Sequence, residues 1–360
     1  MNQQNFVPDK KMWFSEEISE PDTVFYNVKE APFAIYGLYS PLTEPVFKRI
    51  PDELGQSVSD GVAYLYRNTA GGRVRFATDS PYLILRMRTH KVHRFNHMTN
   101  LAGAGFDLYE DDPETKHSRF VHAFVPPTAM NEGYESKHTS PDRTLRYYTL
   151  NFPLYNDVDE LYIGIKEGSV LSEGLPYDGE APIIYYGSSI TQGGCASRPG
   201  NSYEAMICRR LNRDYLNMGF SGSAKGEPEL AEYLATLPMS VFVCDYDYNA
   251  PSVEHLEATH YPFYKIIRAK NPTLPYLMVS RHTARGQNPD SDRRREIIRA
   301  SYEKAKASGD ENVYFLDGGS FFPDEWRDSC TVDTTHPNDL GFYFMACAIG
   351  DALAEILKKQ

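Results

Sequence analysis

The sequence predicts a multidomain protein, with an N-terminal β-sandwich of the jelly-roll kind and a C-terminal α/β domain of three layers. Three observations lead to this fold class. The chain has 360 residues, which is more than one hydrophobic core usually organises. Residues 1–175 contain short β-rich runs separated by turn signals, whereas residues 181–360 alternate strands with helices. Hydrophobic residues make up 41% of the chain and charged residues 24%, as in ordinary globular proteins.

The N-terminal domain is expected to consist of strands joined by short turns. The expected strands are residues 62–67, 73–78, 82–88, 106–110, 119–125, 143–152 and 160–166. Gly71-Gly72 and the sequence TDSP at 78–81 supply turns between the first three of them. No amphipathic helix is expected here, and AGAG at 102–105 is interpreted as a turn. Many short strands at this spacing favour a sandwich.

The C-terminal domain follows a Gly/Pro-rich, acidic stretch at 173–183. The expected strands are residues 183–186, 215–220, 240–245, 276–280 and 313–317. The expected helices are residues 201–212, 227–236, 253–270, 291–308 and 339–358. This alternation predicts βαβ units and a parallel sheet that helices cover on both faces.

Charge and cysteine content narrow the classes of function. A net charge of -12 and a pI near 5.4 disfavour nucleic acid as a partner, because a phosphate-backbone binder needs a basic face. The five cysteines are Cys195, Cys208, Cys244, Cys330 and Cys347. Their odd number and the lack of a C-x-x-C pair predict reduced thiols rather than disulfides or a zinc ribbon.

The start of the chain, MNQQNFVPDKKMWFSEE, lacks the features of a secretory signal, and the sequence contains no run of about 18 apolar residues. We therefore expect a cytoplasmic protein with no membrane partner. A secreted chain whose signal had been removed would look the same. The sequence does not predict an oligomeric state.

The sequence YYGSSITQGG at 185–194 places two adjacent serines directly after the first strand of the parallel sheet. One interpretation is structural: Gly187 supplies an unusual backbone angle and the serines cap the next helix. The other is that one serine is a nucleophile, because ligands of open parallel sheets bind beyond the carboxyl ends of the strands. Polar groups also follow other strands, and Asp333 and His336 stand in VDTTHPND near the C-terminus.

The chemistry of these residue types fits acyl transfer. A serine hydroxyl becomes nucleophilic when a histidine accepts its proton, and a carboxylate must orient that histidine. Asp333 and His336 are three residues apart, so one turn can deliver both. The developing oxyanion needs hydrogen-bond donors, which Gly222 after the second strand and Asn249 after the third can offer.

These blocks, in this order, resemble the SGNH hydrolase superfamily, which includes the GDSL esterases. GSSIT is similar to its first block and puts Ser189 at the nucleophile position; NMGFSG, DYDYNA and DTTH resemble later blocks. The resemblance implies a flavodoxin-like domain in which Ser189, Asp333 and His336 are catalytic. It also implies an oxyanion hole formed by Ser189 N–H, Gly222 and Asn249.

The match departs from the superfamily pattern in two places. Ser188 replaces the usual aspartate of the first block, and the third block lacks the Gly-x-Asn-Asp wording. Thr191 stands where the second glycine of a Gly-x-Ser-x-Gly elbow would be, which disfavours an α/β-hydrolase. The N-terminal half resembles the sandwich that precedes the catalytic domain in some bacterial carbohydrate esterases, where it would contact carbohydrate or act as a scaffold.

Other polar groups are weighed as secondary candidates. His90, His93 and His97 have a spacing that metal ligands can have, but they lie at a strand end and in a loop, and no metal site is predicted. Arg281 and His282 follow the fourth strand and are candidate substrate-binding residues, although a salt-bridged arginine fits as well. Asp317, at the end of the fifth strand, is the alternative candidate for the carboxylate that orients the histidine, should Asp333 not do so. Residues 293–295, three arginines, are interpreted as a solvated helix face.

The function that we expect is a serine esterase that removes a short acyl group, acetyl, from a carbohydrate and needs no cofactor. The expected partner is a small-molecule or oligosaccharide ester. One alternative is a lipid or thioester acylhydrolase with the same triad. Another is a carbohydrate-binding protein whose hydrolase domain is inactive. The sequence identifies neither the sugar nor the ester position.

Overall fold

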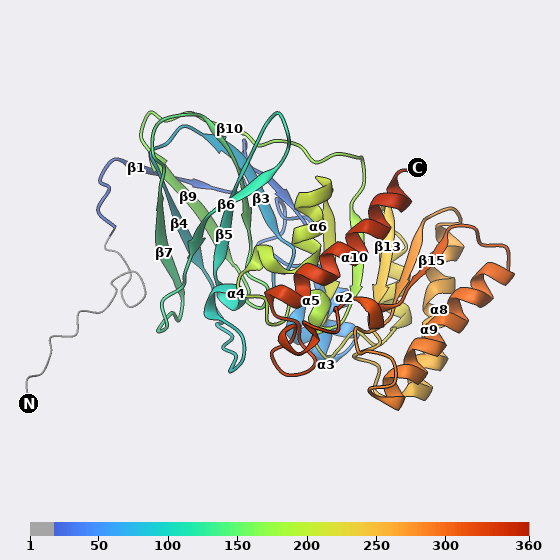
Figure 1. Cartoon of the computed structure of the whole chain (residues 1–360). Coiled ribbons are helices and arrows are strands. Elements are labelled where there is room, and N and C mark those ends of the chain that lie inside the picture. Colours follow the sequence, from blue (N-terminus) through green and yellow to red (C-terminus); the bar gives the residue numbers. More distant parts are fainter. Residues whose placement is uncertain (1–17, 360) are drawn as a thin grey trace, which may run out of the picture.

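The computed structural model describes residues 18–359 and contains two β-sheet layers followed by an α/β unit (Figure 1). The start of the chain, from which the lack of a signal was predicted, lies outside the described residues. The N-terminal strands are β1 (Thr23–Asn27), β2 (Ala34–Tyr36), β3 (Arg73–Thr78), β4 (Tyr82–Arg88), β5 (Phe106–Asp111), β6 (Ser118–Phe124), β7 (Gly133–Thr139), β8 (Arg146–Asn151), β9 (Glu160–Lys166) and β10 (Leu171–Glu173).

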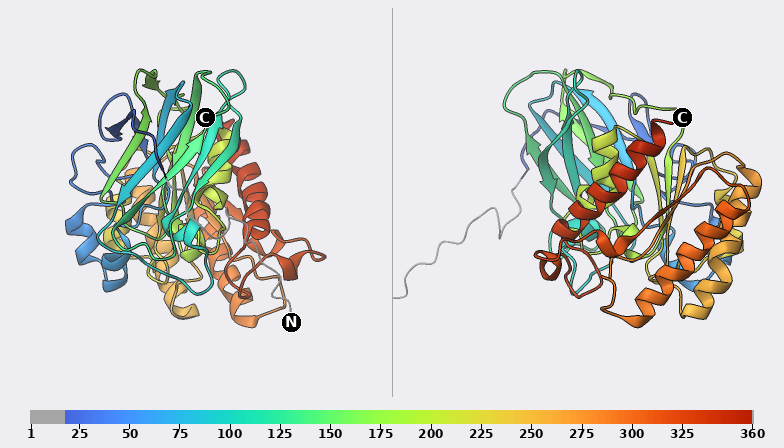
Figure 2. Two further views of the ribbon diagram at one scale, coloured as in Figure 1. Left: turned by 90° about the vertical axis from the view of Figure 1, so that its left-hand side faces the viewer. Right: turned by 45° about the vertical axis from the view of Figure 1, so that its right-hand side comes forward.

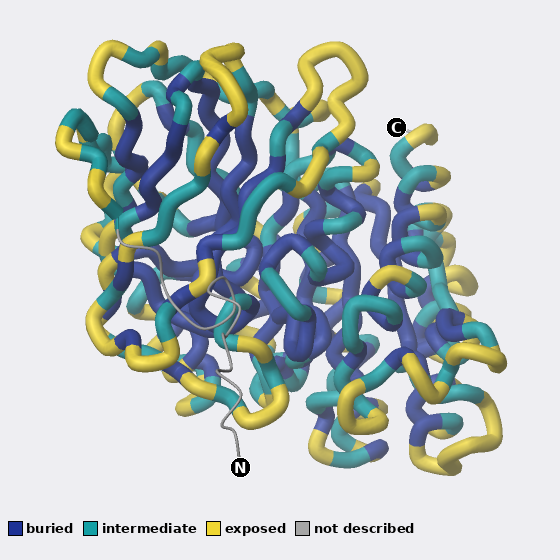
Figure 3. Tube along the Cα trace, turned by 60° about the vertical axis from the view of Figure 1, so that its left-hand side comes forward, coloured by how far each residue is buried: buried dark blue, intermediate teal, exposed yellow. Residues whose placement is uncertain are grey.

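These strands form two antiparallel sheets that pack as a sandwich. One sheet has the order β1-β9-β4-β7, and the other has the order β10-β3-β8-β5-β6 with β2 paired to β3. Apolar side chains from both sheets, among them Val74, Phe76, Leu85 and Ile163, meet in one buried cluster. Figure 3 shows the strands largely buried and the connecting loops exposed. The predicted sandwich is therefore present.

The expectation of a helix-free N-terminal half is wrong. Three short helices occur between residues 18 and 175: α2 (Asp52–Ser57), α3 (Asp60–Leu65) and α4 (Asn100–Ala104). Residues 62–67 were expected to be a strand, but Ser59 caps α3 by accepting the N–H of Val62. Val62 and Leu65, three residues apart on one helix face, pack into a core of the C-terminal sheet. AGAG at 102–105 likewise ends α4 rather than forming a simple turn.

The C-terminal elements follow the predicted alternation. The strands are β11 (Ile183–Gly187), β12 (Tyr215–Gly219), β13 (Val241–Asp245), β14 (Tyr276–Val279) and β15 (Val313–Leu316). The helices are α5 (Ser189–Gln192), α6 (Tyr203–Leu211), α7 (Pro228–Leu234), α8 (Val253–Lys270), α9 (Pro289–Ala307) and α10 (Asp339–Leu357). Short 3₁₀ turns lie at Pro199–Asn201, Gly318–Ser320 and Arg327–Ser329.

The five C-terminal strands form a parallel sheet with the order β12-β11-β13-β14-β15. The alternation along β11 assigns side chains to two faces. Ile183 and Tyr185 belong to one apolar core, and Ile184 and Tyr186 belong to the other. This order is that of flavodoxin-like folds, in which the carboxyl ends of the central strands are the expected ligand site.

The helices cover both faces of the parallel sheet. Helices α6 and α10 pack between the sheet and the sandwich, while α8 and α9 cover the opposite face (Figures 1 and 2). Helix α10 is long and apolar enough to cross a membrane by length and composition, with a mean hydropathy of 1.6. However, Phe342, Ile349 and Leu353 of this helix are fully buried against the sheet, which is what a core helix requires.

Buried charged side chains join the sandwich to the α/β unit. Asp107 of β5 is fully buried and accepts hydrogen bonds from Asn151 Nδ2 at 2.8 Å, from Arg198 at 2.9 Å and from the Gly200 N–H at 2.8 Å. Arg49 is 1% exposed and donates to the backbone carbonyl of Gly219 at the end of β12. Such groups are costly to bury unless they are paired, so these contacts define how the two halves fit together.

We predict that Asp107→Ala destabilises the protein by about 3–5 kcal/mol, because it leaves the Arg198 guanidinium and the Gly200 N–H without their buried acceptor. The midpoint of urea unfolding measures the loss. Arg119→Ala is the control: Arg119 is 69% exposed in its ion pair with Glu110, and such pairs contribute about 0–1 kcal/mol. Equal small effects for both variants would contradict the role of Asp107.

Candidate active site

The two adjacent serines lie in the turn between β11 and α5 and have different environments. Ser188 is fully buried, and its hydroxyl caps α5 by accepting the N–H of Ile190 at 3.2 Å. Ser189 is the first residue of α5 and is partly exposed. The structural interpretation of the sequence therefore holds for Ser188, and Ser189 is the serine whose side chain is available for chemistry.

Gly187 makes this turn possible because the chain passes close to neighbouring backbone there. A Cβ at position 187 would lie 2.3 Å from the carbonyl oxygen of Asp245 and 2.1 Å from the Thr191 hydroxyl. Both distances are shorter than the contacts that real Cβ atoms make. The Ser188 N–H also donates to the Asp245 carbonyl at 3.2 Å. Close contact between the ends of β11 and β13 thus holds Ser189 at the edge of the sheet.

Ser189, His336 and Asp333 form a continuous hydrogen-bonded chain. Ser189 Oγ is 2.9 Å from His336 Nε2, and His336 Nδ1 is 2.7 Å from Asp333 Oδ2. Both histidine and carboxylate come from the loop between β15 and α10. His336 is 23% exposed and Asp333 is 38% exposed, so solvent and a substrate can reach the group.

The loop that carries the histidine is held by its own backbone. The Val332 N–H donates to the His336 carbonyl at 2.9 Å, and Thr334 has the left-handed angle φ 68° that reverses the chain. Asn338 then caps α10 by accepting the N–H groups of Leu340 and Gly341. The imidazole is therefore positioned by a tight turn fixed to the start of a buried helix.

The carboxylate of Asp333 is kept ionised by its hydrogen bonds. Partial burial by itself raises its pKa. The backbone N–H and imidazole of His336 and the N–H of Thr335 outweigh that effect and lower the pKa of Asp333 to about 2. Asp333 thus stays negative at all ordinary pH values. It can hold the Nδ1 proton of His336 and leave Nε2 as a hydrogen-bond acceptor for Ser189.

The predicted oxyanion donors lie together beyond the ends of β12 and β13. The Gly222 N–H donates to Asn249 Oδ1 at 3.2 Å, and Asn249 Nδ2 donates to the Phe220 carbonyl at 2.8 Å. Gly222 has φ 67°, a left-handed angle that suits glycine. A substrate oxygen would have to exchange with these existing bonds before either group could donate to it.

Gln192 of α5 connects the serine turn to the Gly222 loop. Its Oε1 accepts the Ser221 N–H at 3.0 Å, and its Nε2 donates to Asn68 and to the Leu154 carbonyl in the N-terminal half. Gln192 is fully buried. The sequence gives no sign of this role, because a glutamine in a short helix carries no signal until its three partners are known.

The N-terminal half also reaches the serine turn through side chains that the sequence analysis did not select. The Tyr155 hydroxyl donates to the Ser189 carbonyl at 3.0 Å. The ring of His97 lies edge-on to the ring of His336, with centroids 5.6 Å apart. Cys195, two residues beyond Gly193, is 7% exposed, and its φ of 74° is rare for a residue other than glycine.

The Cys195 thiol is not set up as a nucleophile. Burial, followed by the nearby charge of Asp333, raises the pKa of Cys195 to about 11. Thiols attack as thiolates, so without a bound cation this group is a poor nucleophile at neutral pH.

The three histidines of the sequence THKVHRFNH do not converge on one point. His90 pairs with Asp159 at 2.8 Å, and the His93 ring contacts the Tyr64 hydroxyl at 2.9 Å. Of the three, His97 is the one that lies against His336. Among residues 18–359, one set of side chains has its ligand atoms within 4.8 Å of one another in the way that a metal requires: His97, Cys195 and His336.

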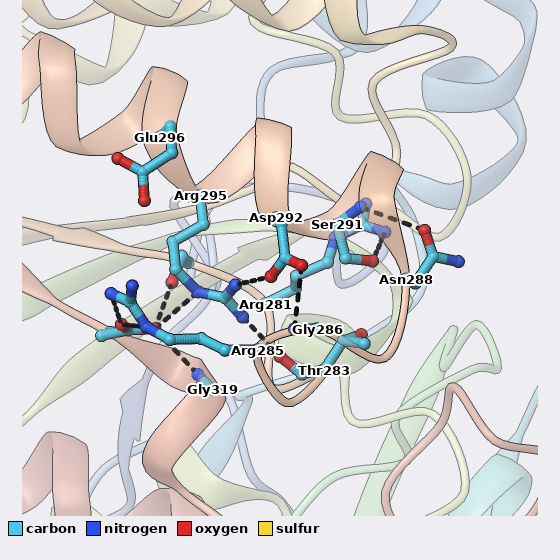
Figure 4. Close-up of polar contacts among 12 residues, drawn as sticks. Arg281, Thr283, Arg285, Gly286, Asn288, Ser291, Asp292, Arg295, Glu296 and Gly319 are labelled. Carbon is cyan, nitrogen blue, oxygen red and sulfur yellow. Dashed lines mark hydrogen bonds and ion pairs between the residues drawn. The ribbon is translucent and has the colours of Figure 1, made fainter.

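The proposal that Arg281 binds substrate is not supported by its position. Arg281 Nε donates to Asp247 Oδ2 at 3.2 Å, and a second guanidinium nitrogen donates to Ser291 at the start of α9 (Figure 4). Asp247 is fully buried. Arg281 therefore neutralises a buried carboxylate, which is the salt-bridge alternative that the sequence left open.

The arginines at 293–295 and the alternative candidate carboxylate Asp317 also have structural partners. Only Arg293 is solvated. Arg294 donates to the carbonyls of Asp247 and Ala250. Arg295 bonds to Asp292 (Figure 4) and also to Asp317. The helix-face interpretation is therefore wrong for two of the three arginines, because the loops around the start of α9 leave carbonyls and carboxylates that need donors.

His282 is also buried, and it supports the loop that carries His336. Its side chain is 4% exposed, lies against Tyr248 and Phe322, and has its Nε2 2.8 Å from the Thr335 carbonyl, one residue before His336. Burial lowers the pKa of His282 to about 4. The ring is therefore neutral at pH 7 and positions the loop through one hydrogen bond.

We predict that His282 contributes to acid sensitivity. Its pKa is lowered in the folded state, so the stabilisation is fully present above the unfolded value of 6.5 and is lost as the pH falls toward 4. Melting temperatures between about pH 7 and pH 4.5 should fall less for His282→Gln than for the wild type. His90→Gln, at an exposed position, is the control. Parallel curves for wild type and His282→Gln would contradict this assignment.

Comparison with known families agrees with the geometry of the site. Residues 180–357 match the GDSL-like Lipase/Acylhydrolase family, and residues 23–171 match the family described as the N-terminus of SGNH hydro-type esterases. The chain is an SGNH hydrolase of the GDSL type. The pattern Gly-x-Asp-Leu-Tyr in the name of the second family corresponds to residues 105–109, which include the buried Asp107. No curated protein sequence matches this hydrolase significantly.

Solved structures with the same architecture extend over nearly the whole SGNH hydrolase. A protein from Bacteroides ovatus ATCC 8483 described as a GDSL-like lipase is 28% identical, with a TM-score of 0.83, and the match covers 93% of this chain and 98% of that one. A salicylyl-acyltransferase from a tetracycline biosynthetic pathway is 19% identical, with a TM-score of 0.75 and coverages of 94% and 98%. An acetyl xylan esterase from the rumen bacterium Butyrivibrio proteoclasticus is 13% identical, with a TM-score of 0.57 and coverages of 93% and 99%.

These matches establish the two-part fold and place the protein among enzymes that act on acyl esters.

Proposed function

We propose that this hydrolase is a serine esterase in which Ser189 is the nucleophile, His336 the general base and Asp333 the residue that orients it. The observation that carries the proposal is the unbroken chain from Ser189 Oγ through both imidazole nitrogens to Asp333. The three side chains come from opposite ends of a 180-residue unit, and a purely structural role does not require their alignment.

The reaction follows from the protonation states. Ser189 Oγ attacks the acyl carbon while His336 Nε2 takes its proton. His336 then gives that proton to the leaving alcohol, and the acyl group remains on Ser189. Water, deprotonated by the same nitrogen, releases the acid and restores the serine. Asp333 holds the imidazole and stabilises its charged form throughout.

The oxyanion is stabilised by hydrogen-bond donors, two of which must give up their present partners when the substrate binds. The Ser189 N–H at the first turn of α5, the Gly222 N–H and the Asn249 amide are the proposed donors. Gly222 and Asn249 are paired with each other before substrate binds. Turning the Asn249 amide so that Nδ2 faces the substrate would free both groups at once.

We infer that the acyl group is short, acetyl, and that the alcohol is a carbohydrate hydroxyl. Polar side chains contact Ser189 and His336: the Tyr155 hydroxyl bonds to the Ser189 carbonyl, and the His97 ring lies against the His336 ring. These side chains suit a hydrophilic alcohol better than a long alkyl chain. The neighbouring fold of an acetyl xylan esterase, which has the same two-part architecture, supports this choice of substrate class.

Replacement of each serine separately tests the nucleophile. Ser189→Ala should lower the rate of hydrolysis of an aryl acetate by about a thousandfold or more and leave the fold intact. Ser188→Ala is the matched control, since it removes a helix cap worth about 1 kcal/mol but no reacting atom, and should keep the rate within about tenfold. A fully active Ser189→Ala enzyme would overturn the proposed mechanism.

Acyl-chain and leaving-group comparisons test the substrate class. The enzyme should hydrolyse aryl acetate with a higher kcat/KM than aryl octanoate, and should release acetate from an acetylated neutral oligosaccharide. The Ser189→Ala protein, assayed in parallel, sets the background. A preference for octanoate would favour a lipid acylhydrolase, and binding of the oligosaccharide with no hydrolysis of any ester would favour the inactive carbohydrate-binding alternative.

A further inference from the structure

His97, Cys195 and His336 bring two nitrogens and one sulfur together beside Ser189, from three separate parts of the chain. The His97 loop belongs to the sandwich, Cys195 follows α5, and His336 precedes α10 (Figure 1). Their ligand atoms all lie within 4.8 Å of one another. Imidazole nitrogen and thiolate sulfur are the donors that Zn²⁺ prefers, whereas Mg²⁺ and Ca²⁺ prefer oxygen.

We propose that His97, Cys195 and His336 form an inhibitory binding site for Zn²⁺ or a similar thiophilic divalent cation, which closes the active site by occupying the base. Only the inhibitory effect of the metal rests on the proposed function of His336. Metal binding itself does not depend on that function.

The histidine at the centre of the site already has the hydrogen bond that metal ligands use. His336 Nδ1 is bound to Asp333 Oδ2 at 2.7 Å, which leaves the lone pair of Nε2 pointing toward Ser189. A carboxylate behind a ligating imidazole fixes the tautomer and raises the basicity of the ligand. Asp333 also supplies a negative charge close to the cation.

The two other ligands are held near this nitrogen by contacts between the domains. The Thr99 hydroxyl donates to the Ser197 carbonyl at 2.7 Å, so the segments that carry His97 and Cys195 are joined two residues beyond each of them. Cys195 is 7% exposed, and His97 is exposed at the surface. The cysteine is thus fixed, while the histidine has room to turn.

The distances permit a metal with a small adjustment. Bond lengths of about 2.0–2.3 Å place the ligand atoms of a tetrahedral zinc site roughly 3.3–3.6 Å apart. The three atoms therefore need to approach by about 1 Å, which rotation of the exposed His97 side chain can supply. On binding, the Cys195 thiol gives its proton to solvent, and the metal takes the Nε2 position that the Ser189 hydroxyl occupied. Ser189 keeps its proton and loses its base.

The test begins with metal binding, read without any activity assay. Co²⁺ added to the metal-free enzyme should give a thiolate-to-cobalt charge-transfer band and the visible bands of tetrahedral cobalt. Cys195→Ser should lose the thiolate band, whereas Cys347→Ser, a cysteine on α10 outside the site, should keep it. Zn²⁺ should raise the melting temperature of the wild type, because it links the two domains, and Mg²⁺ should not. An unchanged thiolate band in Cys195→Ser would overturn the site.

Inhibition is then measured with an aryl acetate. Zn²⁺ should inhibit the wild type reversibly, and excess chelator should restore the full rate. The inhibition constant should weaken by about tenfold or more in His97→Ala and Cys195→Ser, since loss of even a hydrogen-bond partner to a ligand costs roughly 10- to 100-fold in metal affinity. His90→Ala should respond like the wild type. Equal inhibition of His97→Ala and wild type would overturn the proposal.

The failure of the zinc site and the failure of the proposed function give different results. An enzyme that hydrolyses the ester but shows neither the cobalt spectrum nor the zinc-induced thermal shift lacks the site and keeps the function. An enzyme that is inactive after chelation and regains activity with Zn²⁺ uses the metal in catalysis, which would overturn both proposals.

Discussion

The buried carboxylate of Asp107 is the constraint on which the arrangement of the two halves depends. It lies in a sandwich strand, yet it binds Arg198 and the Gly200 N–H in the segment that follows the serine helix. That segment in turn contacts the start of α10, because Ser197 and Asn201 both donate to Asp339. One buried charge thus connects the sandwich to the two segments that carry the serine and the histidine. The sandwich is therefore a structural part of the active site.

The site combines a rigidly held serine turn and histidine loop with neighbouring side chains that must move when substrate binds. The serine turn is held by backbone contacts between adjacent strands, and the histidine loop is held by His282 and by the cap of α10. The hydrogen bond between Gly222 and Asn249, in contrast, is exposed, and so is the His97 side chain. This division suits an esterase, because the proton relay must be preorganised while the donors around the substrate exchange their partners when it binds.

The position of His97 shows how a second domain can influence chemistry without contributing a reacting group. Its loop comes from the sandwich, and its ring lies against the imidazole of His336, the proposed general base. The Tyr155 hydroxyl, also from the N-terminal half, donates a hydrogen bond to the backbone carbonyl of Ser189. Residues 93–105 and 153–157 are joined to each other by the hydrogen bond from Asn156 Nδ2 to the Gly103 carbonyl. The second of these segments bonds to α5 through the Leu154 carbonyl and the Tyr155 hydroxyl. Access to the serine is therefore shaped by residues from both halves.

The sequence by itself determined the elements and the residues of the relay. Short β-rich runs between turn signals predicted β3, β4 and β9 to the residue, and the order of the blocks predicted that Ser189, Asp333 and His336 meet. Those patterns are local, because a strand or a short motif carries its own signal. Tertiary structure decided the rest. It made residues 60–65 a helix by packing Val62 and Leu65 into a distant core, and it turned Arg281 and His282 from substrate candidates into supports. It also brought His97 and Cys195 to His336. These outcomes depend on which buried charges and carbonyls need partners, and a single sequence does not state where those groups meet.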